Sequence, residues 1–324
     1  MKAAVLKQLG VAPVYENFPD PVITGGQQEI MNVIAASVKN LDKARAAGTH
    51  YANYTNLPAV VGIDGVGWLQ DGTLAYAQGV SGTIAEKAVI NKGHYIKLPA
   101  GIDPDIAAAL PNAVIGSAMA LKCRAKITQG STVLINGATG VTGTVAIQLA
   151  KYYGAKTVIA TGRNAAQLQK ARELGADHTI SLLQEDDAMI SQVKALHQQT
   201  PIDIVIDYLW GKPTGLLIDA LMGKGINHVA HKTIVVTVGG MAGDLLPLSS
   251  GALRSSDIQI LGSGFGSLSP QDFQEFNTTL LPEAFQLAAA QKLLIEIDTA
   301  PLQTIETAWN QPLSPGKRLV IKIK

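Results

Sequence analysis

A glycine-rich turn between a buried strand and a helix is the feature that most constrains the fold of this chain. The turn Gly137–Gly143 follows an apolar run, Thr132–Asn136, and opens a segment with apolar residues at helical spacing through Leu149. In a doubly wound parallel sheet, such a turn presents backbone N–H groups and the positive end of a helix dipole to a pyrophosphate. The alternative is a purely structural turn. The sequence predicts dinucleotide binding by Ala138, Thr139, Gly140, Val141 and Thr142.

The end of the next predicted strand indicates which dinucleotide binds. The run Thr157–Thr161 ends, about twenty residues after the turn, in Gly162 and Arg163. NAD sites usually carry Asp or Glu here to accept hydrogen bonds from the ribose 2′-hydroxyl, whereas the planar guanidinium of Arg163 can bind a 2′-phosphate. We therefore predict NADPH, although Arg163 in a solvent-exposed loop is the alternative. The further predicted cofactor-binding residues are Thr161, Gly162, Arg163 and Gly239, the last directly after an apolar run at 233–238.

The strand-end sequence Asp207–Gly211 follows another apolar run. Ligands of parallel sheets gather at the carboxyl ends of the strands, so this segment points to the nicotinamide side. Trp210 could line a pocket there, or it could serve only in packing.

The pattern of elements changes twice along the chain. Alternating runs such as Lys2–Leu6 and Glu29–Val38, with a hairpin over Val66–Tyr76, predict a small antiparallel barrel. After Ser131, strands alternate with helices, which predicts a parallel sheet covered on both faces. Alternation returns near the C-terminus. We therefore predict an α/β chain with a first domain at 1–115, a doubly wound sheet at 116–262, and a return to the first domain at 263–324.

Composition argues against several other classes. The 26 Lys and Arg residues nearly balance the 25 Asp and Glu residues, so charge favours neither nucleic acid nor an anionic membrane as partner. The single cysteine, Cys123, excludes an intrachain disulfide and a cysteine-cluster metal site, and fits a reducing cytosol. The most apolar run, Ile106–Leu121, contains Pro111 and Asn112, which argues against a membrane span. We expect a soluble cytoplasmic protein.

Five segments share the pattern of one known family. They are Met1–Leu6, Ala35–Asp42, Leu57–Gly67, Gly137–Gly143 and Gly316–Val320. Through them the whole chain resembles the zinc-independent quinone oxidoreductases of the medium-chain dehydrogenase/reductase superfamily. The resemblance implies a GroES-like barrel domain built from both chain ends and a Rossmann domain between them. It also implies a homodimer, in which the last Rossmann strand, expected at Ser256–Leu261, pairs with its twofold mate.

The stretches that hold catalytic zinc in related dehydrogenases are altered here. Those relatives use a Cys ahead of an Asp, a His within Gly-His-Glu, and a second Cys just before the Rossmann domain. The matching stretches are Lys39–Asp42, Gly62–Asp64 and Pro111–Ala113, and they contain neither Cys nor His. Catalytic zinc normally needs three protein ligands, so we predict no metal. The remaining closely spaced histidines, His228 and His231, are explained at least as well as polar loop residues.

The missing zinc ligands point to a particular chemistry. Alcohol oxidation loses its Lewis acid, whereas a quinone or a conjugated enone accepts hydride from the nicotinamide and forms an oxyanion that hydrogen-bond donors stabilise. We predict an NADPH-dependent oxidoreductase that reduces quinones or α,β-unsaturated carbonyls. A second hypothesis is an NADPH-binding protein with little turnover, as in relatives that serve as crystallins. The predicted catalytic donors are Lys39, Asn40 and Tyr51.

Two of these donors have a simpler alternative role. Tyr51 could merely pack a loop together with Tyr54, and Lys39 could point to water. Neither residue belongs to the phosphate turn, so neither is expected to affect cofactor affinity.

Overall fold

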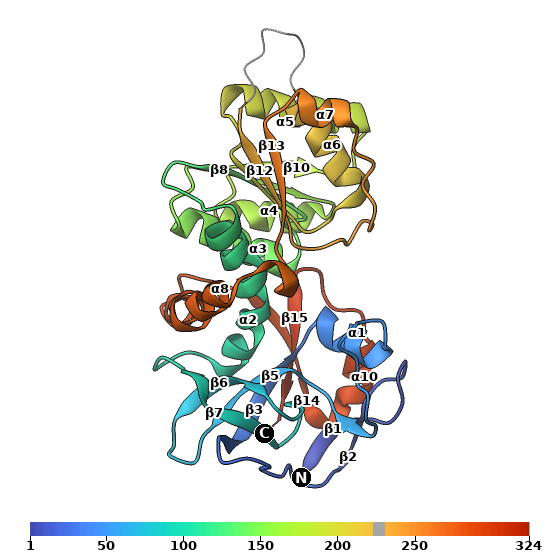
Figure 1. Cartoon of the computed structure of the whole chain (residues 1–324), viewed down its shortest axis with the longest axis vertical. Coiled ribbons are helices and arrows are strands. Elements are labelled where there is room, and N and C mark those ends of the chain that lie inside the picture. Colours follow the sequence, from blue (N-terminus) through green and yellow to red (C-terminus); the bar gives the residue numbers. More distant parts are fainter. Residues whose placement is uncertain (223–230, 324) are drawn as a thin grey trace. The chain divides into compact units, whose positions relative to one another are not determined.

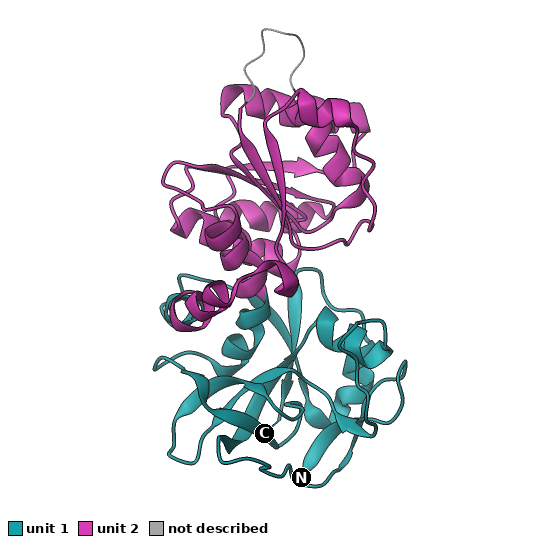
Figure 2. Ribbon diagram, in the orientation of Figure 1, with its two compact units in different colours: residues 1–112, 281–324 teal, residues 113–280 magenta. Residues whose placement is uncertain are grey.

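The computed structural model describes residues 1–222 and 231–323 and divides into two compact units (Figure 2). Unit 1 comprises residues 1–112 and 281–324, and unit 2 comprises residues 113–280. The chain leaves unit 1 within helix α2 (Pro104–Met119) and returns at the start of α9 (Leu281–Ala289).

The return to the first domain was predicted at 263, and this boundary is wrong because the helical segment before 281 belongs to unit 2. The Arg124 Nε donates a hydrogen bond to the Gly262 carbonyl at 2.7 Å. The thiol of Cys123 forms a side-chain hydrogen bond with Asp272. Gly262 ends the last strand of unit 2 and Asp272 lies in the helical segment after it, and both contact the π-helical turn η1 (Ala120–Arg124) of the same unit.

Unit 2 contains a six-stranded parallel sheet with the strand order β10-β9-β8-β11-β12-β13 (Figure 1). This is the doubly wound Rossmann order, in which the direction of winding reverses between β8 and β11. The strands are β8 (Thr132–Asn136), β9 (Thr157–Gly162), β10 (His178–Ser181), β11 (Ile204–Asp207), β12 (Thr233–Thr237) and β13 (Ile258–Gly262). The helices are α3 (Val141–Tyr152), α4 (Ala165–Glu173), α5 (Asp186–Gln199), α6 (Gly211–Leu221), α7 (Ser250–Arg254), η2 (Phe265–Ser267), α8 (Pro270–Glu275) and η3 (Phe276–Leu280).

The core of unit 2 follows from the composition of its central strands. Leu134, Ile159, Val205 and Val235 come from four neighbouring strands and pack in one buried cluster. Strands that are buried on both faces have continuous runs of apolar, β-branched residues in their sequence. These runs made the parallel sheet predictable.

Unit 1 contains a six-stranded sheet in the order β14-β15-β3-β5-β6-β7, and β3 also pairs with β7, which closes a barrel. Strands from both chain ends meet in it, since Val320 of β15 pairs with Ser37 of β3. The predicted barrel built from both chain ends is confirmed. Its strands are β3 (Gln28–Val38), β5 (Asp64–Trp68), β6 (Leu74–Gly79), β7 (Lys87–Lys97), β14 (Glu296–Pro301) and β15 (Lys317–Lys322). The other elements are β1 (Lys2–Leu6), β2 (Val14–Asn17), β4 (Ala59–Val60), α1 (Asn40–Ala47), η4 (Leu302–Thr304) and α10 (Ile305–Asn310).

Helix α2 passes through Pro111 without ending there. Pro111 lacks the N–H that would bond to the carbonyl four residues earlier, yet Ala107, Leu110 and Ala113 around it are fully buried. With η1 it forms one apolar helical stretch, Pro104–Arg124, that is long and apolar enough to cross a membrane by length and composition alone. Pro111 and Asn112 therefore do not keep this stretch from meeting the length and composition of a membrane span. Of its most apolar window, 67% is buried inside the protein, as in a core helix.

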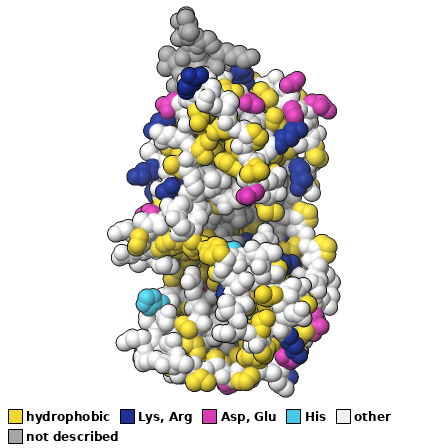
Figure 3. All heavy atoms as spheres, turned by 45° about the vertical axis from the view of Figure 1, so that its right-hand side comes forward, with side chains coloured by type: hydrophobic (Ala, Val, Ile, Leu, Met, Phe, Trp, Pro, Cys, Tyr) yellow, Lys and Arg dark blue, Asp and Glu magenta, His cyan; other side chains and the backbone are white. Residues whose placement is uncertain are grey.

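The surface carries charges of both signs. On the face shown in Figure 3, Lys and Arg side chains are interspersed with Asp and Glu side chains. This distribution agrees with the near-zero net charge of +1 and gives this face no single-sign field that would steer a polyanion to it.

Candidate functional site

The glycine turn of unit 2 brings the N-terminus of α3 to the carboxyl edge of the sheet. Gly137 has a φ of +84°, which favours glycine. A Cβ at Gly143 would lie 2.6 Å from the Cα of Ala138, so only glycine lets the helix approach the turn this closely. Gly140 is the N-cap residue of α3 and has no side chain to cap it.

The space in front of this helix end suits a phosphate. A Cβ at Gly140 would meet only the Gly137 carbonyl oxygen, at 3.8 Å, so this position is open. The first N–H groups of a helix have no intrahelical partner, which leaves those of Val141 and Thr142 for an anion. These residues fit a bound pyrophosphate. Ala138 is buried instead, and its N–H donates to the Thr161 carbonyl at 2.8 Å.

The end of β9 lies against the same turn. A Cβ at Gly162 would come within 2.2 Å of the Thr139 Cγ2, so glycine is needed where strand and turn meet. The Arg163 side chain directly after β9 is exposed. Gly239, after β12, donates its N–H to the Asp207 carbonyl at 3.3 Å. The structure thus brings the glycine turn and the end of β9 together within unit 2.

The predicted contact of Thr161 with the cofactor has a competitor within the protein. Its hydroxyl accepts from the Gly137 N–H at 3.1 Å and donates to the Asn136 Oδ1 at 2.7 Å. The side chain is fully buried. Thr161 supports the turn from beneath.

Trp210 has a φ of +56° and a ψ of −164°. This region is occupied almost exclusively by glycine and costs a non-glycine residue about 1–3 kcal/mol. The Asp207 carboxylate accepts from the Trp210 N–H at 3.2 Å to each oxygen. The sequence singled out this segment by its place at a strand end, but no pattern in it signals the strained backbone.

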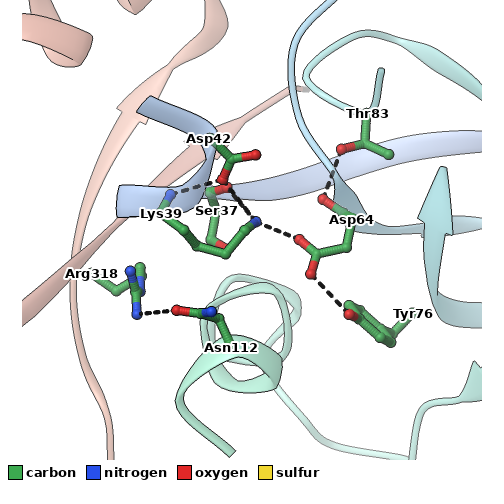
Figure 4. A network of polar contacts seen from close by, with 8 residues as sticks. All are labelled: Ser37, Lys39, Asp42, Asp64, Tyr76, Thr83, Asn112 and Arg318. Carbon is green, nitrogen blue, oxygen red and sulfur yellow. Dashed lines mark hydrogen bonds and ion pairs between the residues drawn. The ribbon is translucent and has the colours of Figure 1, made fainter. Parts of the chain in front are cut away.

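Unit 1 holds a buried cluster of ionisable side chains around Lys39 (Figure 4). The Lys39 Nζ lies 2.5 Å from the Asp64 Oδ1 and 3.1 Å from the Asp42 Oδ2, and it donates to the Ser37 carbonyl at 3.0 Å. Lys39 is 3% exposed, so the alternative in which it points to water is wrong. The Tyr76 hydroxyl donates to the Asp64 Oδ2 at 2.9 Å. The end of β3 and the starts of α1 and β5 thus meet at one ammonium, and β6 reaches it only through the contact of Tyr76 with Asp64.

Two carboxylates of this cluster share one ammonium. Burial alone would lower the pKa of Lys39, but the negative charges of Asp42 and Asp64 raise it, so the lysine stays protonated. Burial raises the pKa of Asp42, and the single ammonium that it shares with Asp64 offsets this only in part. Burial and the charge of Asp64 raise the pKa of Tyr76 well above its usual value, so the phenol stays a donor.

The three stretches that correspond to zinc-binding stretches of relatives all contribute to unit 1. Lys39 and Asp64 are ion-paired, and the Asn112 Oδ1 accepts from the Arg318 Nη2 at 3.0 Å in the same view (Figure 4). Within residues 1–222 and 231–323, no three His, Cys, Asp or Glu side chains are grouped to hold a metal. His231 pairs with Asp203 at 2.8 Å, and His228 lies outside the described residues.

The other two predicted donors lie apart from the Lys39 cluster. Asn40 is exposed at the first position of α1. Tyr51 is 85% exposed, and its ring contacts His50 at 4.1 Å between centroids. The Arg45 Nε donates to the Ala52 carbonyl at 2.7 Å and holds this loop against α1. The alternative, in which Tyr51 only packs a loop, does not account for a side chain this exposed. The catalytic role of Tyr51 stays a prediction.

The Rossmann sheet of unit 2 and the closed barrel that both chain ends form in unit 1 are the two domains that the sequence resemblance implied. A family model described as zinc-binding dehydrogenase matches residues 141–281, which exclude all three altered zinc stretches. A probable NADPH-dependent quinone reductase of Emericella nidulans is 28% identical over 95% of this chain and 96% of its own length. The NADPH-dependent alkenal/one oxidoreductase of Arabidopsis thaliana chloroplasts is 33% identical, over 57% of this chain and 53% of the relative.

Among solved structures, the quinone oxidoreductase of Thermus thermophilus matches over 100% of both chains, with a TM-score of 0.81 and 24% identity. This likeness concerns the fold. The family model and the sequence relatives support a place for this chain among the quinone oxidoreductases of the medium-chain dehydrogenase/reductase superfamily.

Proposed function

We propose that this protein is a cytoplasmic NADPH-dependent oxidoreductase that reduces quinones or α,β-unsaturated carbonyls by hydride transfer without zinc. The observation that carries the proposal is the buried Lys39 ammonium, ion-paired with Asp64 and Asp42 where relatives hold zinc. The names of the Emericella and Arabidopsis relatives support the two acceptor classes.

The residues of this chain have separable tasks in that reaction. When bound, NADPH supplies the hydride, which suits an acceptor that is already electron-poor. The N-terminus of α3 binds the pyrophosphate, and Arg163 binds the 2′-phosphate. Asn40 and Tyr51 offer an amide and a phenol to the oxyanion, while Lys39 supplies a fixed positive charge within unit 1.

The test is NADPH oxidation, followed at 340 nm, with a panel of quinones and enones. We expect turnover with at least one acceptor class and none with simple alcohols and NADP⁺. Tight NADPH binding with no oxidation across the panel would favour the cofactor-binding hypothesis over the reductase.

Zinc should not be required for activity. A divalent cation near Asp42 and Asp64 would have to displace the Lys39 ammonium, which both carboxylates already hold. Metal analysis of protein purified without a histidine tag should find well under one zinc per chain, and chelation should leave turnover intact. Stoichiometric zinc together with chelator-sensitive activity would overturn this part of the proposal.

Tyr51→Phe should lower kcat by roughly 10²-fold, the scale of a lost proton donor or oxyanion contact. The Kd for NADPH should stay unchanged, because Tyr51 lies in unit 1 and outside the phosphate turn. Tyr152→Phe removes another exposed phenol, in unit 2, and serves as the matched control. If kcat of Tyr51→Phe equals that of the control, Tyr51 has no catalytic role.

The protein should also form a homodimer through β13. Within the described residues this strand pairs with β12 alone, and its Ile258 and Ile260 side chains are half-buried. An open strand edge of this kind is usually covered. Light scattering at micromolar concentration should give twice the chain mass of 34.0 kDa, and a strictly monomeric mass would argue against the dimer.

A further inference from the structure

A chain of buried side chains runs beneath the dinucleotide turn and is not used by the proposed chemistry. Asn136, Thr161, Asp207 and Thr214 are all 0% exposed. They come from the ends of β8, β9 and β11 and from α6. The Asn136 Nδ2 donates to the Asp207 Oδ1 at 2.9 Å, and the Asn136 Oδ1 accepts from the Thr161 hydroxyl at 2.7 Å.

The direction of each hydrogen bond from the Gly137 N–H through Thr161 and Asn136 to Asp207 is fixed. The Gly137 N–H can only donate, so the Thr161 oxygen accepts there and gives its single proton to Asn136. The Asn136 amide must then turn its NH₂ toward Asp207. Asp207 can receive it because an ionised carboxylate is an acceptor only. The Asp207 carboxylate therefore orients the Asn136 amide and, through it, the Thr161 hydroxyl beneath the turn.

At its other end Asp207 holds the start of α6. Its Oδ1 accepts from the Leu209 N–H at 3.0 Å, and its Oδ2 accepts from the Thr214 hydroxyl at 2.7 Å. Both oxygens also face the N–H of Trp210, the residue with the strained backbone. One carboxylate is thus bonded to the loop after β11 directly and to the turn after β8 through two side chains.

We propose that Asp207 is a positioning residue that sets the dinucleotide turn and the Trp210 peptide together, with Asn136 and Thr161 as the connection between them. The proposal rests on dinucleotide binding at the turn. Thr161 then acts on the cofactor through the Gly137 peptide. Cofactor binding at the turn changes the surroundings of the Trp210 indole, because the turn and the Trp210 peptide are both held by Asp207.

Thr161→Val tests the connection, since it keeps the side-chain shape and removes the hydroxyl. Calorimetry should show a Kd for NADPH raised roughly tenfold, because a buried amide oxygen and a peptide N–H lose their partner. Thr161→Ser restores the hydroxyl and should return the Kd to within about twofold of the unmutated protein. Asp207→Asn, which removes the charge at the same shape, should weaken binding in the same direction.

Tryptophan fluorescence gives a readout that loss of stability would not produce. NADP⁺ is the titrant, because it does not absorb the tryptophan emission. The difference between the unmutated protein and Trp210→Phe isolates the Trp210 signal from Trp68 and Trp309. We expect NADP⁺ to change this signal, and we expect the change at saturation to be at least about halved in a Thr161→Val background.

Ser269→Ala is the control for stability, because it removes a helix cap of unit 2, the bond from the Asp272 N–H to the Ser269 Oγ. It should lower Tm and leave the Kd for NADPH unchanged. Equal Kd values and equal Trp210 signals in Thr161→Val and the unmutated protein would overturn the role of Asp207. Absence of NADPH binding in the unmutated protein would instead overturn the proposed function.

Discussion

Lys39→Met should destabilise the protein by about 3–5 kcal/mol, the cost of removing one partner from a buried ion pair. The variant roughly keeps the length of the side chain and removes the ammonium that pairs with both buried carboxylates, Asp42 and Asp64. The Asp42 Oδ1 has no hydrogen-bond partner within the described residues, and in the variant the Oδ2 keeps the bond from the backbone N–H of residue 39, at 2.9 Å. At roughly 2–4 °C per kcal/mol, the first calorimetric transition should fall by about 6–20 °C.

The pH dependence of this loss follows from the direction of the pKa shifts. Burial already raises the pKa of Asp42 in the folded protein, and without the positive charge of Lys39 this pKa rises further above its unfolded value. The folded variant therefore binds protons more readily than the unfolded chain, and its stability increases as the pH falls toward the ordinary carboxyl range. The raised pKa of Lys39 means that the stabilisation in the unmutated protein is lost only at alkaline pH.

The difference in Tm between Lys39→Met and the unmutated protein should therefore be greatest near neutral pH and shrink on acidification. Lys87→Met is the matched control, because Lys87 pairs with Asp20 at the exposed surface, where solvent screens the interaction. Its Tm should barely change at any pH. A Lys39→Met variant that melts like this control would show that the buried ammonium contributes nothing to stability.

The fold was largely predictable because its signals are local. The strands Lys2–Leu6 and Thr132–Asn136 have the expected bounds, since each is an apolar run that ends at a charged residue or a glycine. Helix α3 begins at Val141, where the glycine N-cap requires it. The errors lie where distant contacts decide. The return to the first domain was expected at 263 but begins at 281, because the helical segment between them packs within unit 2.

The two halves of the candidate site differ in the same way. The dinucleotide turn was predictable because its glycines and the strand before it are adjacent in sequence. The Lys39 cluster was not, because Lys39 meets Asp64 across 25 positions and Asn112 meets Arg318 across 206. Strand pairing in the barrel creates these contacts, and no spacing in the sequence records the register. The Asp207 chain was missed for the same reason, since Asn136 lies 71 positions away.

Arg163→Ala should remove most of the preference for NADPH over NADH. The two cofactors differ only in the 2′-phosphate, so the ratio of their Kd values isolates the contacts made to that group. A charge-assisted hydrogen bond contributes roughly 1.5–3 kcal/mol, or about ten- to a hundredfold in affinity. Because the Arg163 side chain is exposed, we expect the lower part of this range at physiological salt and a larger preference at low ionic strength.

Arg172→Ala is the control for this measurement. Its guanidinium lies on α4 in the same unit, but it is occupied by the Thr179 hydroxyl, at 2.7 Å from the Nη2. Removing it changes the net charge of unit 2 by the same amount and should leave the Kd ratio intact. Equal affinities for NADPH and NADH in the unmutated protein would contradict the prediction directly. If both substitutions reduce the Kd ratio equally, the preference comes from the overall charge of unit 2. Both variants lose one positive charge, but only Arg163→Ala loses it at the end of β9.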